Sequence, residues 1–164
     1  MKLESLKDLY LEQLRDLYSA ETQLVDALPK MAAAASSPDL KAGFNEHLRQ
    51  TQEQVRRLER IFNDLSQKPT GHTCEGMKGL IKEGEEMIKT KGEPAAIDAG
   101  LIAAAQRVEH YEIAGYGTVR TYAELLGHNE HVTLLERSLN EEEETDERLT
   151  ELAESHINEE ALVR

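Results

Sequence analysis

The chain has 164 residues, enough for one domain with a substantial core. Its formal net charge is −13, from 32 acidic and 19 basic residues. Such a charge opposes contact with phosphate backbones and anionic membrane surfaces, so we expect no nucleic-acid partner and no membrane partner. A single cysteine, Cys74, excludes an intramolecular disulfide and a CxxC zinc site. The charged N-terminus and the lack of a long apolar stretch predict a cytoplasmic protein.

Strong helix formers dominate the composition, and this predicts an all-α fold. Apolar residues spaced by three and four predict helices over about 5–35, 38–65, 74–89, 94–126 and 129–155. Ser5 with Asp8 suits the start of the first helix, and Pro29 is expected to bend or interrupt its last turns.

Turn signals separate the later helices. Ser37 and Pro38 suit the N-cap and first position of the second helix. Pro and Gly residues mark a loop over 66–73, and Gly92-Glu93-Pro94 precedes the helix that begins at about 94. Gly127 suits a helix C-terminus, Asn129 is the expected N-cap of the last helix, and the tail 154–164 is expected to fray.

This order of helices predicts a specific topology for a single domain over 1–164. Two tight hairpins, 5–65 and 94–155, are joined by a long connection that holds the short helix 74–89. Short loops imply antiparallel neighbours, and one long crossover is typical of the ferritin-like four-helix bundle.

Polar residues interrupt the apolar stripe of each long helix. They are Glu21 in 5–35, His47, Thr51 and Gln54 in 38–65, Glu109 and Glu112 in 94–126, and Glu142 and Asp146 in 129–155. Each lies roughly 16–28 Å from its own interhelical turn at about 1.5 Å per residue. All therefore stand near mid-height and meet in one layer, whichever way the two hairpins dock.

The charge of this layer predicts metal binding. No Lys or Arg falls on the inner stripes near its five carboxylates, and each buried unpaired ion costs several kcal/mol. The carboxylates must therefore be protonated, hydrated or neutralised by cations, and two divalent ions bring +4 against −5. Oxygen-rich sites with one imidazole suit iron or manganese. The pattern predicts two Fe ions, with Mn as the alternative, on Glu21, His47, Glu109, Glu112, Glu142 and Asp146.

Neighbouring polar residues have simpler interpretations. Thr51 and Gln54 are expected to hydrogen-bond the ligands, and Tyr18 to donate a hydrogen bond or an electron near them. Glu141 is interpreted as part of a solvated face, although a shift of one residue would put it in place of Glu142. Residues predicted to be incidental or on the surface are Cys74, His72, His110, His128, His131 and His156.

Several segments resemble the YciE/YciF family of bacterial stress-associated ferritin-like proteins. They are DLYSAETQL at 16–24, LPKMA at 28–32, HLRQTQEQVRRLE at 47–59, GLIKEGEEMI at 79–88, RVEHYEIAGYGT at 107–118, AELLGH at 123–128 and SLNEEEETDERL at 138–149. The resemblance covers nearly the whole chain. It implies a ferritin-like bundle, often dimeric, with a rubrerythrin-like metal position at the six residues predicted to be ligands.

The chain departs from the wider ferritin pattern of Glu-x-x-His on the second and fourth long helices. Its second long helix has His47 with Thr51 and Gln54 and lacks a bridging Glu, and its fourth has Glu142-x-x-x-Asp146 without His. The predicted site therefore contains one His where two are usual.

The leading functional hypothesis is a stress-response metalloprotein that is expected to form a homodimer and that oxidises Fe(II) or reduces O2 or peroxide. Glu112 and Glu142 are the expected bridging ligands, and the other four predicted ligands are terminal. The rival hypothesis is a metal-free helical structural protein that acts through dimer or partner binding. A zinc or manganese hydrolase would need an open coordination position and a substrate pocket, for which the sequence gives no sign. A storage cage is not expected.

Overall fold

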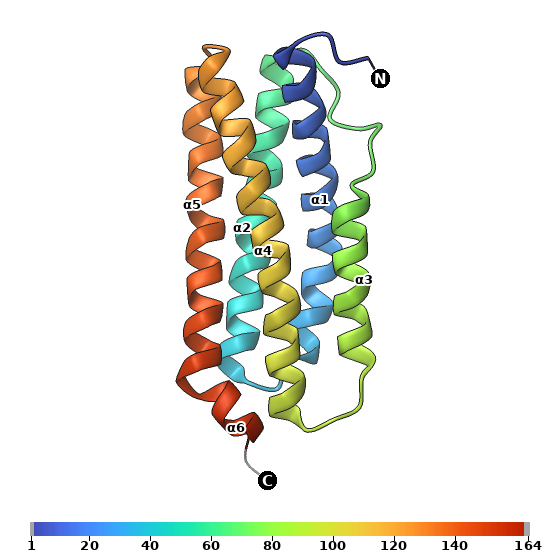
Figure 1. The fold of residues 1–164 in the computed structure, drawn as a ribbon, viewed down its shortest axis with the longest axis vertical. Coiled ribbons are helices and arrows are strands. Elements are labelled where there is room, and N and C mark those ends of the chain that lie inside the picture. Colours follow the sequence, from blue (N-terminus) through green and yellow to red (C-terminus); the bar gives the residue numbers. More distant parts are fainter. Residues whose placement is uncertain (1, 163–164) are drawn as a thin grey trace.

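The computed structural model describes residues 2–162 (Figure 1). Its helices are α1 Leu6–Ala34, α2 Pro38–Asp64, α3 Glu75–Lys89, α4 Pro94–Leu125, α5 Asn129–Leu152 and α6 Asn158–Leu162, with a π-helical turn over Ala153–Ile157. The described residues contain no strand. The predicted fold class, an all-α ferritin-like bundle, is confirmed.

Four long helices form the bundle, and α3 lies outside it. Helices α1 and α2 form one antiparallel hairpin and α4 and α5 the other, with their turns at opposite ends of the bundle (Figure 1). Helix α1 also packs on α4, and α2 packs on α5. Helix α3 covers α1 and α4 on the outside, within the long connection from α2 to α4 (Figure 1).

The starts of α1 and α2 follow the predicted capping chemistry. The hydroxyls of Ser5 and Ser37 accept hydrogen bonds from the third residue beyond each, which satisfies backbone N–H groups at the starts of α1 and α2. Cys74 is a structural residue and not an incidental thiol, because its Sγ caps α3 at Met77 N and also contacts Tyr111 Oη at 2.9 Å. Gly127 has the positive φ of 76° expected beyond α4.

Three local predictions were wrong or incomplete. His128, and not Asn129, occupies the N-cap position of α5, and its side chain makes no capping hydrogen bond. Pro29 does not end α1, which continues to Ala34. The tail after α5 is not simply frayed. Ile157 is buried, at 1% exposure, and α6 packs on α4. Residues 163–164 of the predicted tail, like residue 1 of the predicted domain, lie outside the described residues.

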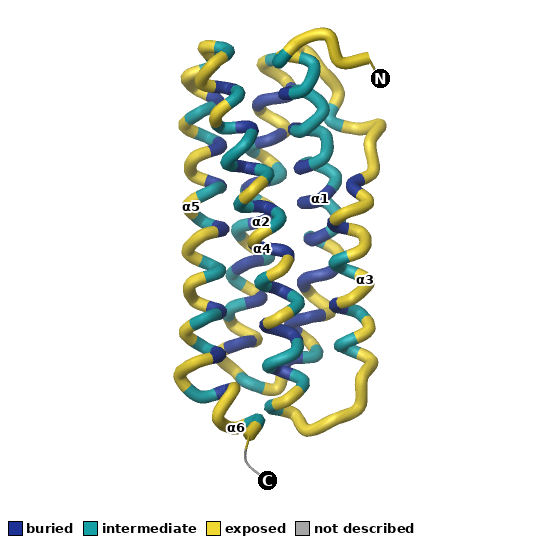
Figure 2. The backbone as a smooth tube through the Cα atoms, viewed as in Figure 1, coloured by how far each residue is buried: buried dark blue, intermediate teal, exposed yellow. Residues whose placement is uncertain are grey.

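The core consists of two apolar clusters, one toward each end of the bundle. One includes Tyr10, Leu58 and Leu135, and the other includes Leu28, Phe44 and Leu101. Buried positions face inward along all four long helices (Figure 2). The boundary between the two clusters falls near the middle of each long helix.

Two glycines of α4 give a matched test of how closely α1 and α4 pack. A Cβ on Gly115 would lie 2.7 Å from Cδ2 of buried Leu17, whereas one on Gly117 would meet nothing within 4 Å. Both alanine variants gain helix propensity, about 1 kcal/mol each. We expect Gly115→Ala to be about 1–3 kcal/mol less stable than Gly117→Ala in urea unfolding, because of overpacking. Equal stabilities would contradict this close approach.

Candidate metal centre

A polar layer separates the two apolar clusters at mid-height. It contains five side chains from all four long helices: Glu21 on α1, His47 on α2, Glu109 and Glu112 on α4, and Glu142 on α5. None of the five is more than 2% exposed. The structure thus brings together five of the six residues predicted to be ligands.

Within the layer the donor atoms form two triads that share one residue. His47, Glu109 and Glu142 form the first triad, and Glu21, Glu112 and Glu142 the second. In each triad the three donor atoms lie within 4.8 Å of one another. Glu142 is therefore placed to contribute to both triads, as expected of a bridging carboxylate.

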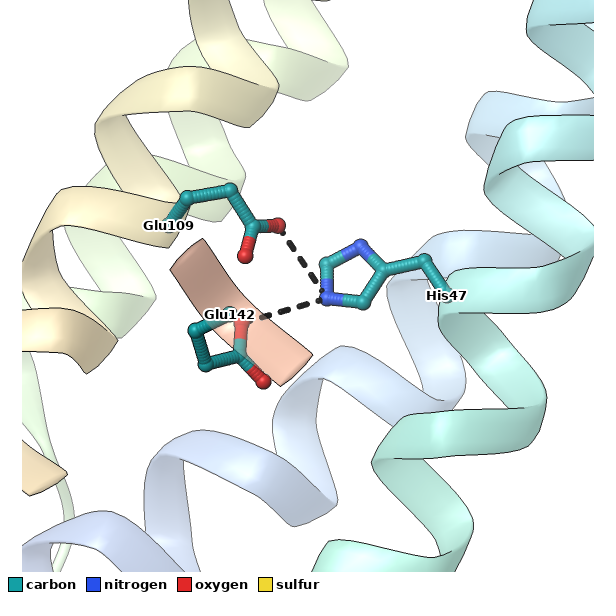
Figure 3. Close-up of side chains that lie close together, drawn as sticks. All are labelled: His47, Glu109 and Glu142. Atoms are coloured by element: carbon teal, nitrogen blue, oxygen red, sulfur yellow. Dashed lines mark ion pairs between the residues drawn. The ribbon is translucent and has the colours of Figure 1, made fainter. Parts of the chain in front are cut away.

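Figure 3 shows the first triad, in which the His47 ring on α2 faces carboxylates from α4 and α5. His47 Nε2 lies 3.1 Å from Glu109 Oε1 and 3.7 Å from Glu142 Oε2. Neither contact has hydrogen-bond geometry, since Nε2 and both carboxylates have no hydrogen-bond partner among the described residues. The three groups converge without satisfying one another.

The layer contains an unusual concentration of unsatisfied buried polar atoms. Among the described residues, both nitrogens of His47, all six oxygens of Glu109, Glu112 and Glu142, and Oε2 of Glu21 lack a hydrogen-bond partner. Buried polar groups are nearly always satisfied, because an unsatisfied one costs about 1–3 kcal/mol, and more when charged. These donors fit divalent cations, which would satisfy the oxygens and the imidazole together.

The formal charge of the layer is one that two divalent cations would balance. The triads contain four carboxylates, because the fifth predicted one lies elsewhere, so their formal charge is −4 when all are ionised. Within residues 2–162 the ion-pair contacts of these carboxylates are with His47, and no Lys or Arg pairs with them. Two divalent ions would balance this charge, and one would leave half of it uncompensated.

Tyr116 is a site residue that the sequence analysis did not single out. Its buried hydroxyl donates a 2.5 Å hydrogen bond to Glu21 Oε1, which leaves Oε2 as the unpartnered oxygen of that carboxylate. Tyr116 lies one helical turn after Glu112, on the inner stripe of α4. Its place on that stripe could have indicated the contact, but an aromatic residue there is usually core.

Burial dominates the electrostatics of the layer. It raises the pKa of Glu21 to about 8, and it raises the pKa values of Glu109 and Glu112 well above the ordinary range, with the Glu142 charge adding to the effect. Burial also acts to raise the pKa of Glu142, but its contacts with Glu109 and His47 outweigh this and lower it. The metal-free layer thus favours an ionised Glu142 among protonated neighbours.

A pH dependence of metal-free stability follows from Glu21. Folding raises its pKa from 4.5 to about 8, so the folded chain holds a proton that the unfolded chain releases. This contribution is fully present below about pH 4.5 and is lost as the pH rises through about 8. We expect chelator-treated protein to be more stable to urea at pH 6 than at pH 8. Glu21→Gln should reduce the difference, with the remainder coming from Glu109 and Glu112, whose pKa values are also raised, and an unchanged profile in that variant would contradict the assignment.

Asp146, the sixth predicted ligand, does not join the layer. Its Oδ2 lies 3.1 Å from Nε2 of exposed His110, and its Oδ1 and main-chain oxygen accept from Gln106. A step of four residues from Glu142 turns the side chain by about 40° toward the α4–α5 seam, where His110 and Gln106 hold it. The placement of His110 on the surface agrees with the prediction.

The residues expected to support the ligands behave differently from one another. Thr51 donates to the main-chain carbonyl of His47 and Gln54 donates to Glu141, so neither makes the expected hydrogen bond to a ligand side chain. The Oε1 atom of Gln54 is unpartnered. Tyr18 donates its hydroxyl hydrogen bond to Glu59 and not to a ligand. Sequence spacing could not distinguish these outcomes, because Tyr18 lies just off the inner stripe of α1.

Glu141 does not replace Glu142 in the layer, and it does not belong to a solvated face as predicted. Its carboxylate is held by the Arg57 guanidinium at 2.5 and 2.9 Å, and both side chains are largely buried between α2 and α5. Arg57 also donates to Ser138 Oγ. This pair borders the polar layer without entering it.

One histidine predicted to lie on the surface is buried. His131 is 4% exposed, with Nδ1 3.1 Å from Tyr10 Oη and its ring stacked on His128 at 4.8 Å between centroids. A position near a helix end is usually exposed, but α1 begins beside the α4–α5 turn and covers His131 there.

Within the described residues no helix is both long and apolar enough to cross a bilayer.

The fold and the polar layer together define a ferritin-like helical bundle with a buried carboxylate–histidine cluster. The chain belongs to the YciF family, described as a domain of unknown function (DUF892), whose model matches residues 5–162. It is 43% identical to Protein YciF of Escherichia coli (strain K12) over 162 residues, covering 98% of both chains.

Solved structures agree with this assignment. The crystal structure of the E. coli stress protein YciF superposes with a TM-score of 0.91 at 42% identity, covering 95% of this chain and 99% of that one. YcfI from Rhodopseudomonas palustris, whose description proposes a structural role, gives 0.87 at 44% identity, covering 91% and 95%. A protein from Xanthomonas campestris pv. campestris gives 0.74 at 22% identity, covering 92% of both chains, and shares the fold.

Proposed function

We propose that the chain is a stress-response metalloprotein that holds two metal ions in the mid-height layer. Iron is the proposed metal, and manganese is the alternative. The observation that carries the proposal is the pair of buried triads sharing Glu142, with their carboxylates and imidazole unpartnered. The E. coli relative described as a stress protein supports the biological setting.

The site geometry favours small substrates. The unpartnered donor atoms are fully buried between two apolar clusters, so a bulky substrate cannot reach them without opening the bundle. When bound, iron at such a site supplies electrons for reduction of O2 or peroxide and is itself oxidised from Fe(II) to Fe(III). The chain's own residues hold the ions, exclude bulk water and, through Tyr116, keep Glu21 in a fixed orientation.

Glu112→Ala tests this proposal against a metal-free role. Glu112 has both oxygens unpartnered, so its loss should abolish binding at the second triad and the consumption of O2 by Fe(II)-loaded protein. Glu124→Ala, on the exposed end of the same helix, should leave both unchanged.

A metal-free structural protein is the second candidate function, favoured by the structural role proposed for YcfI. In that case Glu112→Ala removes the cost of burying an unpartnered carboxyl group, and the variant should be as stable as the parent or more so. Unaltered metal content together with unchanged or higher stability would support the structural role and contradict the proposed metalloprotein.

A further inference from the structure

The two triads differ in chemistry although they share Glu142. The first offers a nitrogen, His47 Nε2, beside two carboxylates, and the second offers carboxylate oxygens alone. We propose that the two halves of the site prefer different metals, so that the centre loads as a mixed pair. This inference rests on the proposed function and deepens it by assigning a metal class to each half.

The His47 half has the donors of a borderline metal. Imidazole nitrogen suits Fe, Zn, Cu and Ni, whereas carboxylate oxygen suits Mg, Ca and Mn. His47 comes within 3.1 Å of Glu109 and 3.7 Å of Glu142 without hydrogen-bond geometry to either, so its nitrogen is free to bind an ion between them.

The Glu21 half has only oxygen donors. Tyr116 occupies Oε1 of Glu21, so the free donors are Oε2 of Glu21, both oxygens of Glu112 and the shared Glu142. Gln54, two turns beyond His47 on α2, donates to Glu141 next to the shared Glu142, and its unpartnered Oε1 is a neutral oxygen. A hard ion such as Mn2+ matches this half better than a borderline ion does.

Zn2+ and Mn2+ are suitable probes. Zinc gives no electron paramagnetic resonance signal, whereas the manganese signal shows which atoms bind the manganese. Apoprotein would receive one equivalent of Zn2+ and then Mn2+ in slight excess, followed by gel filtration and elemental analysis. We expect about one zinc and one manganese per chain. In pulsed measurements this manganese should lack imidazole 14N coupling, whereas protein loaded with manganese alone should show it.

Two variants assign the halves. His47→Gln should lose tightly bound zinc while retaining one manganese, and Glu21→Gln should lose that manganese while retaining zinc. Circular dichroism and urea unfolding of both variants check that the fold is retained, and Glu143→Gln, an exposed neighbour of Glu142, is the control.

The possible outcomes distinguish the unequal halves from the proposed dinuclear site on which they rest. Two ions bound with 14N coupling of manganese in the zinc-loaded protein would overturn the unequal halves but leave the dinuclear site intact. Equal loss of both metals in His47→Gln would overturn them as well. Failure of the unaltered protein to bind either metal would overturn the proposed function itself, and this inference with it.

Discussion

Glu142→Gln should abolish binding of both metal ions, the largest effect expected of any single substitution in the layer. Glu142 belongs to both triads, and it is the layer carboxylate whose pKa is lowered, so it supplies negative charge to each half. The neutral amide keeps the shape of the side chain but removes that charge. Elemental analysis and anaerobic calorimetry with Fe(II) measure the loss.

Glu143→Gln is the matched control for this variant. Glu143 is the next residue on α5, and it is exposed where Glu142 is buried. Each substitution replaces a glutamate carboxylate with a neutral amide, but only Glu142 lies in the layer. Equal metal binding by the two variants would remove Glu142 from the site.

Arg57→Ala should cause the largest loss of stability outside the apolar core. The Arg57 and Glu141 side chains are 10% and 16% exposed and form a two-bond ion pair between α2 and α5. Removing Arg57 leaves a largely buried carboxylate beside the acidic layer. We expect a loss of about 2–3 kcal/mol in urea unfolding, somewhat below the roughly 3–5 kcal/mol for a fully buried pair.

Arg56→Ala controls for the change of charge. Arg56 is adjacent in sequence, but its side chain is 69% exposed and pairs with Glu53 on the same helix. Exposed pairs of this kind contribute about 0–1 kcal/mol. A loss in Arg57→Ala no greater than in Arg56→Ala would show that solvent and the other contacts of Glu141, with Gln54 and Arg137, compensate its carboxylate without Arg57.

The sequence was most informative where residue periodicity and depth along the helix agree. Glu21, His47 and Glu142 interrupt apolar stripes at mid-height on three different helices, and the structure brings them together. Helical geometry turns such spacing into position on a face, so the fold and most of the layer could be predicted before any coordinates were known.

The sequence was least informative about residues at the edge of a stripe. Asp146 and Tyr18 each lie near an inner face, yet partners on neighbouring elements, His110 and Glu59, hold them elsewhere. Tyr116 shows the reverse case, an aromatic residue that fits the core pattern but also donates to Glu21. Such choices depend on the docking of one helix against another, which single-helix periodicity does not contain.

The most direct test of the account is the iron stoichiometry of the unaltered protein. Apoprotein would be titrated anaerobically with Fe(II), separated from free metal and analysed for bound iron. The two triads predict about two iron ions per chain, in keeping with dinuclear carboxylate sites in helical bundles. Absence of stoichiometric iron, and of manganese in a parallel titration, would contradict the metal centre and leave the layer as a structural feature.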